Sequence, residues 1–207
     1  MKITVLSMLL LPALCGNASC DAQEKGNTVP ETQAGREIVV EVQEFVPVES
    51  DRKIRTTNLD LLLRIRAFDT RDFKFHGGLT VSRSRGSITR QTGSSQAGTL
   101  RDETYGSTAT GAGPVLAVQT ELARGGNLSA SLHGSAGVLL YDRDFPWGAS
   151  RYEFMLRYGP TLSYRLNDRQ DLSVTLRGMH VSNGQGFNSH NPQYNAVGLG
   201  VQFLGVF

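Results

Sequence analysis

The sequence predicts an all-β fold, an eight-stranded antiparallel transmembrane β-barrel with short periplasmic turns and longer outer loops. Three observations lead to this prediction. From residue 36 onward, apolar and polar side chains alternate with a period of two. The alternating segments each exceed ten residues, whereas strands of soluble proteins usually have about five or six. The connections between them are alternately short and long, which is typical of barrels in the bacterial outer membrane.

The N-terminus is predicted to be a signal peptide of residues 1–22, because Lys2 precedes an apolar stretch at 3–14 and small residues follow. We therefore expect export to the outer membrane. Both cysteines, Cys15 and Cys20, belong to this segment, so cleavage near residues 20–22 leaves a mature chain without a disulfide. A lipid-modified Cys20 is the alternative. Residues 23–35 are polar and predict a flexible lead-in to a barrel of residues 36–207.

Eight segments carry the alternation, and turn residues separate them. The predicted strands are 36–46, 57–68, 73–84, 108–122, 128–141, 152–166, 171–182 and 194–207. The short polar connections are 69–72, 123–127 and 167–170, and the long ones are 47–56, 86–107, 142–151 and 183–193. An even strand number with this alternation places both termini on the periplasmic side.

One parity of each segment is apolar and the other is polar. In a soluble barrel the apolar parity would face inward, whereas in a membrane barrel it faces lipid and the polar parity fills the lumen. The export signal, the strand lengths and aromatic residues at the ends of the apolar stripes favour the membrane. A charge network inside the barrel is then expected from the polar parity, formed by Glu153, Arg157, Arg165 and Arg177.

Composition excludes several classes of protein. The net charge of +2 and the scattered arginines argue against a nucleic-acid partner. After the signal peptide, no segment approaches the roughly 20 apolar residues of a spanning helix, so any membrane crossing must use strands. The sequence leaves open whether identical chains assemble.

The segment 177–184 contains the residues with the clearest chemical meaning, His180 and Ser182. Two residues apart on a strand, they project from the same face, so the imidazole can activate the hydroxyl as a nucleophile. Both continue the lipid-facing parity of their strand at its outer end. Asn195 holds the equivalent place on the last strand, where its amide can orient the imidazole. These three residues predict a catalytic triad that attacks an ester of a membrane lipid.

An oxyanion would need hydrogen-bond donors nearby. The closest candidates are backbone groups of 183–186, including Asn183 and Gly184, and the side chain of Asn191. No metal site is expected, because His180 and His190 lack a set of carboxylates at useful spacing. No cofactor is expected either.

These residues resemble the lipid A 3-O-deacylases of the PagL type, a family that includes proteins called acyloxyacyl hydrolases. The resemblance covers roughly 114–207 and rests on the segments 134–141, 145–154, 158–164, 180–183 and 191–195. It implies His180 as base, Ser182 as nucleophile, and Asn183 and Asn191 as supports near the oxyanion. It also implies lipid A, the anchor of lipopolysaccharide, as substrate. The family's best-known triad has a glutamate where this chain has Asn195.

Two other functions remain open at this stage. The site also resembles that of outer-membrane phospholipase A, which has His and Ser two residues apart and an Asn nearby. That family has twelve strands and uses calcium, however, and eight strands are predicted here. The second alternative is a non-catalytic structural or adhesive barrel.

Overall fold

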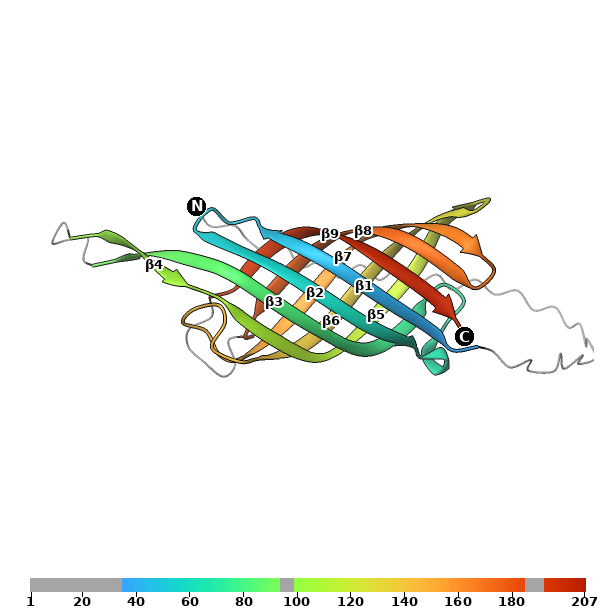
Figure 1. The fold of residues 1–207 in the computed structure, drawn as a ribbon, viewed down its shortest axis with the longest axis horizontal. Coiled ribbons are helices and arrows are strands. Elements are labelled where there is room, and N and C mark those ends of the chain that lie inside the picture. The colour runs from blue at the N-terminus through green and yellow to red at the C-terminus, as the bar shows by residue number, and fades with distance from the viewer. Residues whose placement is uncertain (1–34, 94–98, 185–191) are drawn as a thin grey trace, which may run out of the picture. The chain divides into compact units, whose positions relative to one another are not determined.

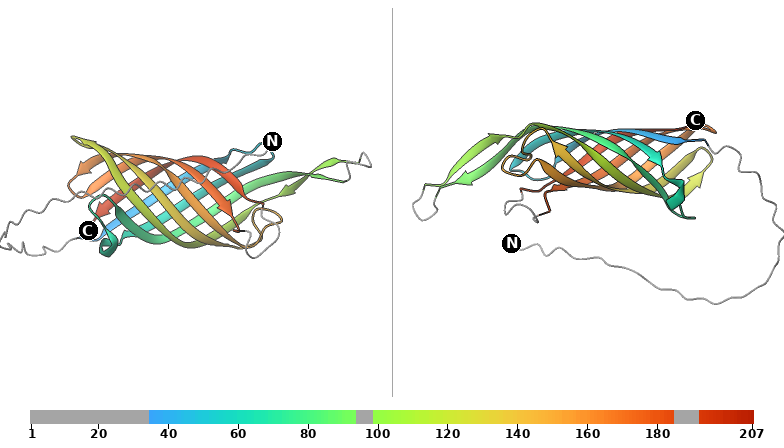
Figure 2. Two further views of the ribbon diagram at one scale, coloured as in Figure 1. Left: turned by 180° about the vertical axis from the view of Figure 1, so that it is seen from behind. Right: turned by 90° about the horizontal axis from the view of Figure 1, so that it is seen from below.

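The computed structural model describes residues 35–93, 99–184 and 192–207. These residues form one antiparallel sheet that closes on itself (Figures 1 and 2). The predicted signal peptide, residues 23–34 of the predicted lead-in, and Asn191 lie outside the described residues. Within the described ranges, the structure has no helix with the length and apolar character that a membrane crossing requires.

The strands and one short helix follow each other in the order β1 (Glu37–Pro47), β2 (Arg52–Arg64), η1 (Arg66–Phe68), β3 (Lys74–Thr92), β4 (Arg101–Gly106), β5 (Ala109–Gly125), β6 (Leu128–Tyr141), β7 (Tyr152–Asn167), β8 (Gln170–Ser182) and β9 (Tyr194–Val206). The barrel order is β2-β1-β9-β8-β7-β6-β5-β3, and pairing of β2 with β3 closes it. β4 pairs with the far part of β3 and prolongs the β3–β5 hairpin beyond the barrel (Figure 2). The predicted eight-stranded antiparallel barrel is therefore confirmed.

The two ends of the barrel differ in the length of the connections between their strands. Two-residue turns join β5 to β6 and β7 to β8. At the same end Arg36 and Phe207 exchange backbone hydrogen bonds of 2.9 and 3.0 Å, which ties the first strand to the last. We call this the turn end, and the opposite end the loop end. Sequence reasoning assigns the turn end to the periplasm.

Three predicted connections differ from the structure. The expected loop 47–56 shrinks to the four residues between β1 and β2, because Ile54 packs inward and β2 begins at Arg52. Much of 86–107 is strand rather than loop, since β3 and β4 pair there. The predicted turn 69–72 belongs to a longer connection that includes η1, which Asp69 stabilises by accepting hydrogen bonds from Arg64 and from the backbone N–H of Phe75.

Side chains alternate between the two faces as the sequence predicts. On β8, Ser173, Thr175 and Arg177 are buried in the lumen, whereas the outward residues of that strand are exposed, namely Leu172, Val174 and Leu176. The outward face of the barrel is a nearly continuous apolar surface from Leu, Val, Phe and Tyr side chains. This is the surface that the hydrocarbon of a bilayer covers.

A spin label tests this orientation directly. With a cysteine at position 176 in bilayers, the attached nitroxide is expected to be accessible to lipid-soluble oxygen, because Leu176 points outward and is 46% exposed. Thr175→Cys is expected to resist labelling in the folded barrel, because Thr175 is fully buried. Electron paramagnetic resonance with oxygen and a polar relaxant measures both. Equal lipid contact at the two positions would contradict the strand parity.

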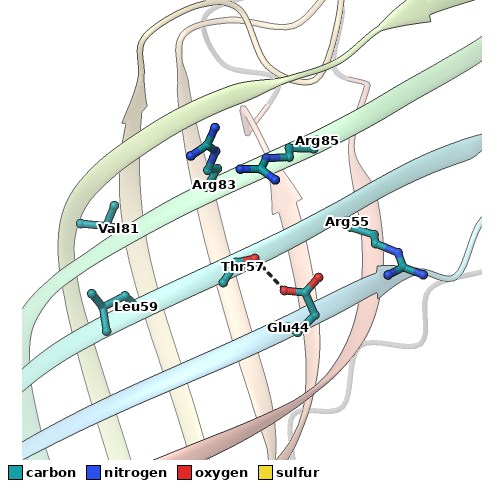
Figure 3. Close-up of a pocket in the computed structure, with 7 residues that line it drawn as sticks. All are labelled: Glu44, Arg55, Thr57, Leu59, Val81, Arg83 and Arg85. Carbon is teal, nitrogen blue, oxygen red and sulfur yellow. Dashed lines mark hydrogen bonds between the residues drawn. The ribbon is translucent and has the colours of Figure 1, made fainter.

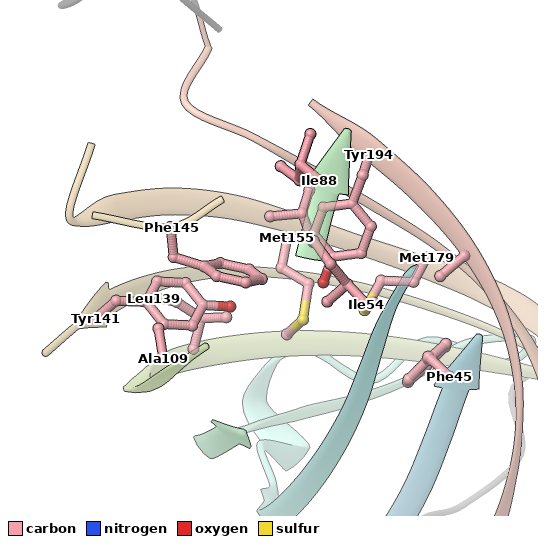
Figure 4. Close-up of a cluster of buried hydrophobic side chains, with 12 residues drawn as sticks. Phe45, Ile54, Ile88, Ala109, Leu139, Tyr141, Phe145, Met155, Met179 and Tyr194 are labelled. Carbon is pink, nitrogen blue, oxygen red and sulfur yellow. The ribbon is translucent and has the colours of Figure 1, made fainter. Parts of the chain in front are cut away.

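An apolar cluster fills the lumen near the loop end (Figure 4). Its larger members are Phe45, Ile54, Ile88, Leu139, Tyr141, Phe145, Met155, Met179 and Tyr194. They come from strands and connections throughout the barrel and converge where the strands approach the long loops. The cluster closes the interior with close-packed side chains, in contrast to the polar filling below it.

A polar layer lies between this cluster and the turn end. Arg157 pairs with Asp60 at 2.7 Å and donates to Gln43 at 2.8 Å. Arg177 contacts Glu41 at 3.4 Å, and it also donates to the Thr161 hydroxyl and to the backbone oxygens of Gly159 and Pro160. The predicted network is thus confirmed for Arg157 and Arg177. Glu153 is buried apart from these arginines, and Arg165 lies partly exposed near Asp171 at the turn end.

The Arg157–Asp60 pair predicts a large effect on stability. Asp60→Asn is expected to lower the free energy of unfolding by about 3–5 kcal/mol, because a buried arginine then loses its counter-charge. The matched control is Glu121→Gln, which breaks the exposed pair with Arg124 and is expected to cost about 1 kcal/mol or less. Urea unfolding in lipid vesicles, followed by tryptophan fluorescence, measures both. Equal losses would show that burial does not strengthen the Asp60 contact.

Candidate functional site

His180 and Ser182 lie at the loop end of β8 on its outward face. They follow Leu172, Val174 and Leu176 on the same parity, and both are half-buried. The two side chains thus share the parity of the outward apolar stripe of β8. On the neighbouring strand β7, Leu156 pairs with His180 and Phe154 pairs with Ser182. The two polar residues are therefore flanked by apolar side chains on this side.

On the other side, β9 presents Asn195 directly opposite His180 in the strand register. The Nδ1 of His180 lies 2.8 Å from the Oδ1 of Asn195. Asn195 is exposed on the outward face, as the parity of β9 requires. The structure thus places Asn195 against the imidazole as the sequence predicts.

A fourth residue, Glu49, joins this arrangement and was missed by sequence reasoning. It lies in the four-residue turn between β1 and β2. Its Oε1 accepts hydrogen bonds from the Asn195 side-chain amide at 2.7 Å and from the Asn195 backbone N–H at 2.8 Å. The turn itself is held to β9, because the Val48 N–H donates to the Asn195 carbonyl at 3.0 Å. Glu49 is 146 positions from Asn195, so no local pattern could have linked them.

These contacts determine which ring nitrogen of His180 carries the proton when the ring is neutral. A carboxylate only accepts hydrogen bonds, so the NH₂ group of Asn195 must face Glu49 and its oxygen must face His180. That oxygen can only accept, so Nδ1 of His180 carries the proton in the neutral ring. The other ring nitrogen, Nε2, then has a free lone pair. This is the tautomer that a general base requires.

The structure gives less information about the contacts of the other predicted site residues. Within the described ranges the Ser182 hydroxyl has no hydrogen-bond partner, so its contact with His180 stays a prediction. Asn183 is fully buried at the end of β8. Gly184 follows with φ of +73°, a left-handed conformation that favours glycine and turns the chain out of the strand. Asn191 lies outside the described residues, so the oxyanion support from these three positions stays a prediction.

The site lies where the outward apolar stripes end. Along five adjacent strands, an apolar residue is followed by a polar one on the outward face, although on β1 the apolar stripe resumes at Val46. The pairs are Leu176 and His180 on β8, Val197 and Asn195 on β9, Val42 and Glu44 on β1, Leu59 and Thr57 on β2, and Val81 and Arg83 on β3. In a membrane barrel such a border corresponds to the level of the lipid headgroups.

An apolar groove lies beside the site, on the outward face of β5, β6 and β7. Two overlapping hollows of about 620 and 360 Å³ share Leu156, Ala136 and Leu116 on the outward face. These three residues continue the register row of His180 across β7, β6 and β5. Because barrel strands are tilted, the row descends from the loop end toward Gly77 near the start of β3. Small residues such as Gly134 and Ala136 leave room along it.

The described residues contain no cluster of three or more His, Cys, Asp or Glu side chains that could hold a metal ion.

Comparisons with known proteins identify the family and the fold of the chain. The family model for lipid A 3-O-deacylase (PagL) matches residues 72–203. The crystal structure of the outer membrane enzyme PagL aligns with a TM-score of 0.52 at 16% identity, over 79% of this chain and 97% of that one. The crystal structure of Neisserial surface protein A aligns with a TM-score of 0.48 at 10% identity, over 83% and 96%. No curated protein matches the chain. The family match spans well over half of the sequence, and the chain belongs to the PagL family of outer-membrane barrels.

Proposed function

We propose that this protein is an outer-membrane esterase that removes an ester-linked acyl chain from lipid A, with Ser182 as nucleophile and His180 as base. The observation that carries the proposal is the hydrogen bond from His180 Nδ1 to Asn195, because it leaves Nε2 free to accept a proton. The family match supports the reaction class. Residues 1–22 are proposed to direct export and residues 23–35 to join the signal to the barrel.

In the proposed reaction, the Ser182 hydroxyl attacks the ester carbonyl while His180 Nε2 takes its proton. The imidazolium that forms keeps its Nδ1–H on the Asn195 oxygen. The tetrahedral intermediate collapses when His180 returns the proton to the leaving alcohol of the sugar. Water then hydrolyses the acyl-serine by the same proton transfers in reverse order, and the fatty acid is released. Backbone N–H groups near Asn183 and Gly184, with Asn191, are proposed to stabilise the oxyanion.

Glu49 is proposed to act through Asn195 as a positioning residue. Its negative charge polarises the amide, which raises the negative partial charge on the oxygen that faces His180. An amide alone stabilises an imidazolium less than a carboxylate does. A carboxylate one hydrogen bond away compensates for part of that difference.

A lipid substrate fits the location of the site. The catalytic residues face outward at the headgroup level, so the outer leaflet is the proposed source of the ester. The groove through Leu156, Ala136 and Leu116 would hold an acyl chain of the lipid. Burial of one methylene group in such a groove contributes about 0.8 kcal/mol.

The decisive experiment offers refolded protein lipid A and, separately, phospholipid, and identifies the products by mass spectrometry. Release of a 3-hydroxy fatty acid from lipid A is expected. Lysophospholipid without lipid A cleavage would instead indicate a phospholipase. A folded barrel that cleaves neither would contradict the enzymatic proposal and favour a structural role.

A further inference from the structure

A cluster of arginines lies on the outward face of the barrel, away from the candidate catalytic residues. Arg55 on β2 and Arg83 and Arg85 on β3 surround a hollow of about 580 Å³, together with Glu44 and Thr57 (Figure 3). Leu59 and Val81 form its apolar side. All seven side chains that line the hollow are exposed.

The charges in this cluster are not balanced within the described part of the chain. Arg55 and Arg85 are directly opposite each other in the register of β2 and β3. Like charges in this position destabilise a sheet unless an anion lies between them. None of the three guanidinium groups has a described ion pair. The carboxylate of Glu44 accepts a hydrogen bond of 2.6 Å from Thr57, its cross-strand neighbour.

The position of the cluster points to a ligand in the membrane. An arginine on the lipid face costs about 2–4 kcal/mol at the bilayer midplane but close to nothing at the interface. Val81 and Leu59 end the apolar stripes just below Arg83 and Arg55, so the arginines stand at the headgroup border. A guanidinium binds phosphate oxygens in a bidentate manner. The adjacent apolar side chains would contact the acyl part of the same molecule.

We infer that Arg55, Arg83 and Arg85 form a binding site for the phosphate groups of an outer-leaflet glycolipid. Three cationic groups around one hollow match a doubly charged phosphate or a pair of phosphates better than a single carboxylate. The inference depends on the orientation of the barrel in the membrane and not on hydrolysis. It assigns the β1–β3 face a role in holding lipid, separate from the proposed chemistry on β8 and β9.

The test measures lipid binding by a protein that cannot turn the lipid over. In a Ser182→Ala background, native mass spectrometry in detergent compares bisphosphorylated lipid A with its dephosphorylated form. The phosphorylated lipid is expected to bind at least about tenfold more tightly. The triple variant Arg55→Gln/Arg83→Gln/Arg85→Gln is expected to lose this preference, and each single substitution to lose part of it.

The matched control removes the same number of positive charges at the turn end, with Arg71→Gln/Arg165→Gln/Arg169→Gln. It is expected to bind lipid A within about twofold of the parent, because net charge alone does not form the site. The heat-dependent mobility of each variant on a gel verifies that the barrel is folded. Equal binding of both lipids, full binding by the first triple variant, or an equal loss in the control would overturn the inference.

Discussion

Ser182→Ala is expected to lower the rate of acyl release from lipid A by roughly 10⁴-fold or more, since the step that forms the acyl-enzyme loses its nucleophile. The fold should be unaffected, because Ser182 is on the outward face at the end of β8 and its hydroxyl has no partner among the described residues. Quantitative mass spectrometry of released fatty acid over time measures the loss.

The control for this variant is Ser173→Ala, on the same strand but facing the lumen. It removes a hydroxyl that donates to Ser163 at 2.8 Å and should leave the rate unchanged. Intact-mass analysis after rapid quenching adds a second readout, because an acyl group should be found on the parent protein and not on Ser182→Ala. A Ser182→Ala protein that retains most of its activity would remove this hydroxyl from the mechanism.

Glu49→Gln is expected to lower kcat by about 10- to 100-fold, which corresponds to about 1.4–2.7 kcal/mol. Glutamine can still accept both hydrogen bonds from Asn195, so the change removes the charge and preserves the geometry. Hydrogen bonds that involve a charged group are worth about 1.5–3 kcal/mol. KM should change little, because Glu49 does not contact the substrate in the proposed mechanism.

The split between kcat and KM distinguishes this role from a structural one. If Glu49 only anchored the β1–β2 turn, Glu49→Gln would lower thermal stability and leave kcat unaffected. Asp102→Asn provides the matched control, because it removes an exposed carboxylate on β4 that lies neither in the arginine-lined hollow nor against Asn195.

Asn195→Glu tests the same chain of hydrogen bonds, from Glu49 through Asn195 to His180, by changing its central residue. The substitution places a carboxylate directly on His180 but also against Glu49, and two carboxylates at hydrogen-bond distance cannot both ionise readily. Asn195→Glu is therefore expected to be impaired, whereas Asn195→Glu/Glu49→Gln is expected to recover activity. A double variant no better than the single one would show that Glu49 and Asn195 are not coupled.

Strand parity predicted most of what positions this site. A period of two fixes which side chains share a face, so the outward placement of His180, Ser182 and Asn195 followed from the sequence without knowledge of the fold's details. The buried roles of Arg157 and Arg177 followed in the same way. Parity does not tell which turn or strand lies beside a given residue along the barrel axis. The contact of Asn195 with Glu49, which lies in the β1–β2 turn, could therefore not be predicted.

Connections were harder to predict than strands. The residues 52–56 carry three charged side chains and a threonine around Ile54 and look like a loop, yet inward packing of that one apolar side chain extends β2. Arg165 has the lumen parity but lies so near the turn end that it reaches water and Asp171. In both cases the deciding factor is the height along the barrel axis, which periodicity does not encode.

The filled interior determines where the second substrate of any hydrolysis must come from. The apolar cluster near the loop end and the ion pairs beneath it occupy the lumen, and the proposed site lies on the outward face, so we expect solvent to reach it from the loop end. In the proposed mechanism, the water that cleaves the acyl-serine then arrives from the hydrated sugar layer outside the cell. Under the proposed function, turnover should therefore respond to the packing and hydration of the surface glycolipids, and a dry, tightly packed leaflet is expected to slow it.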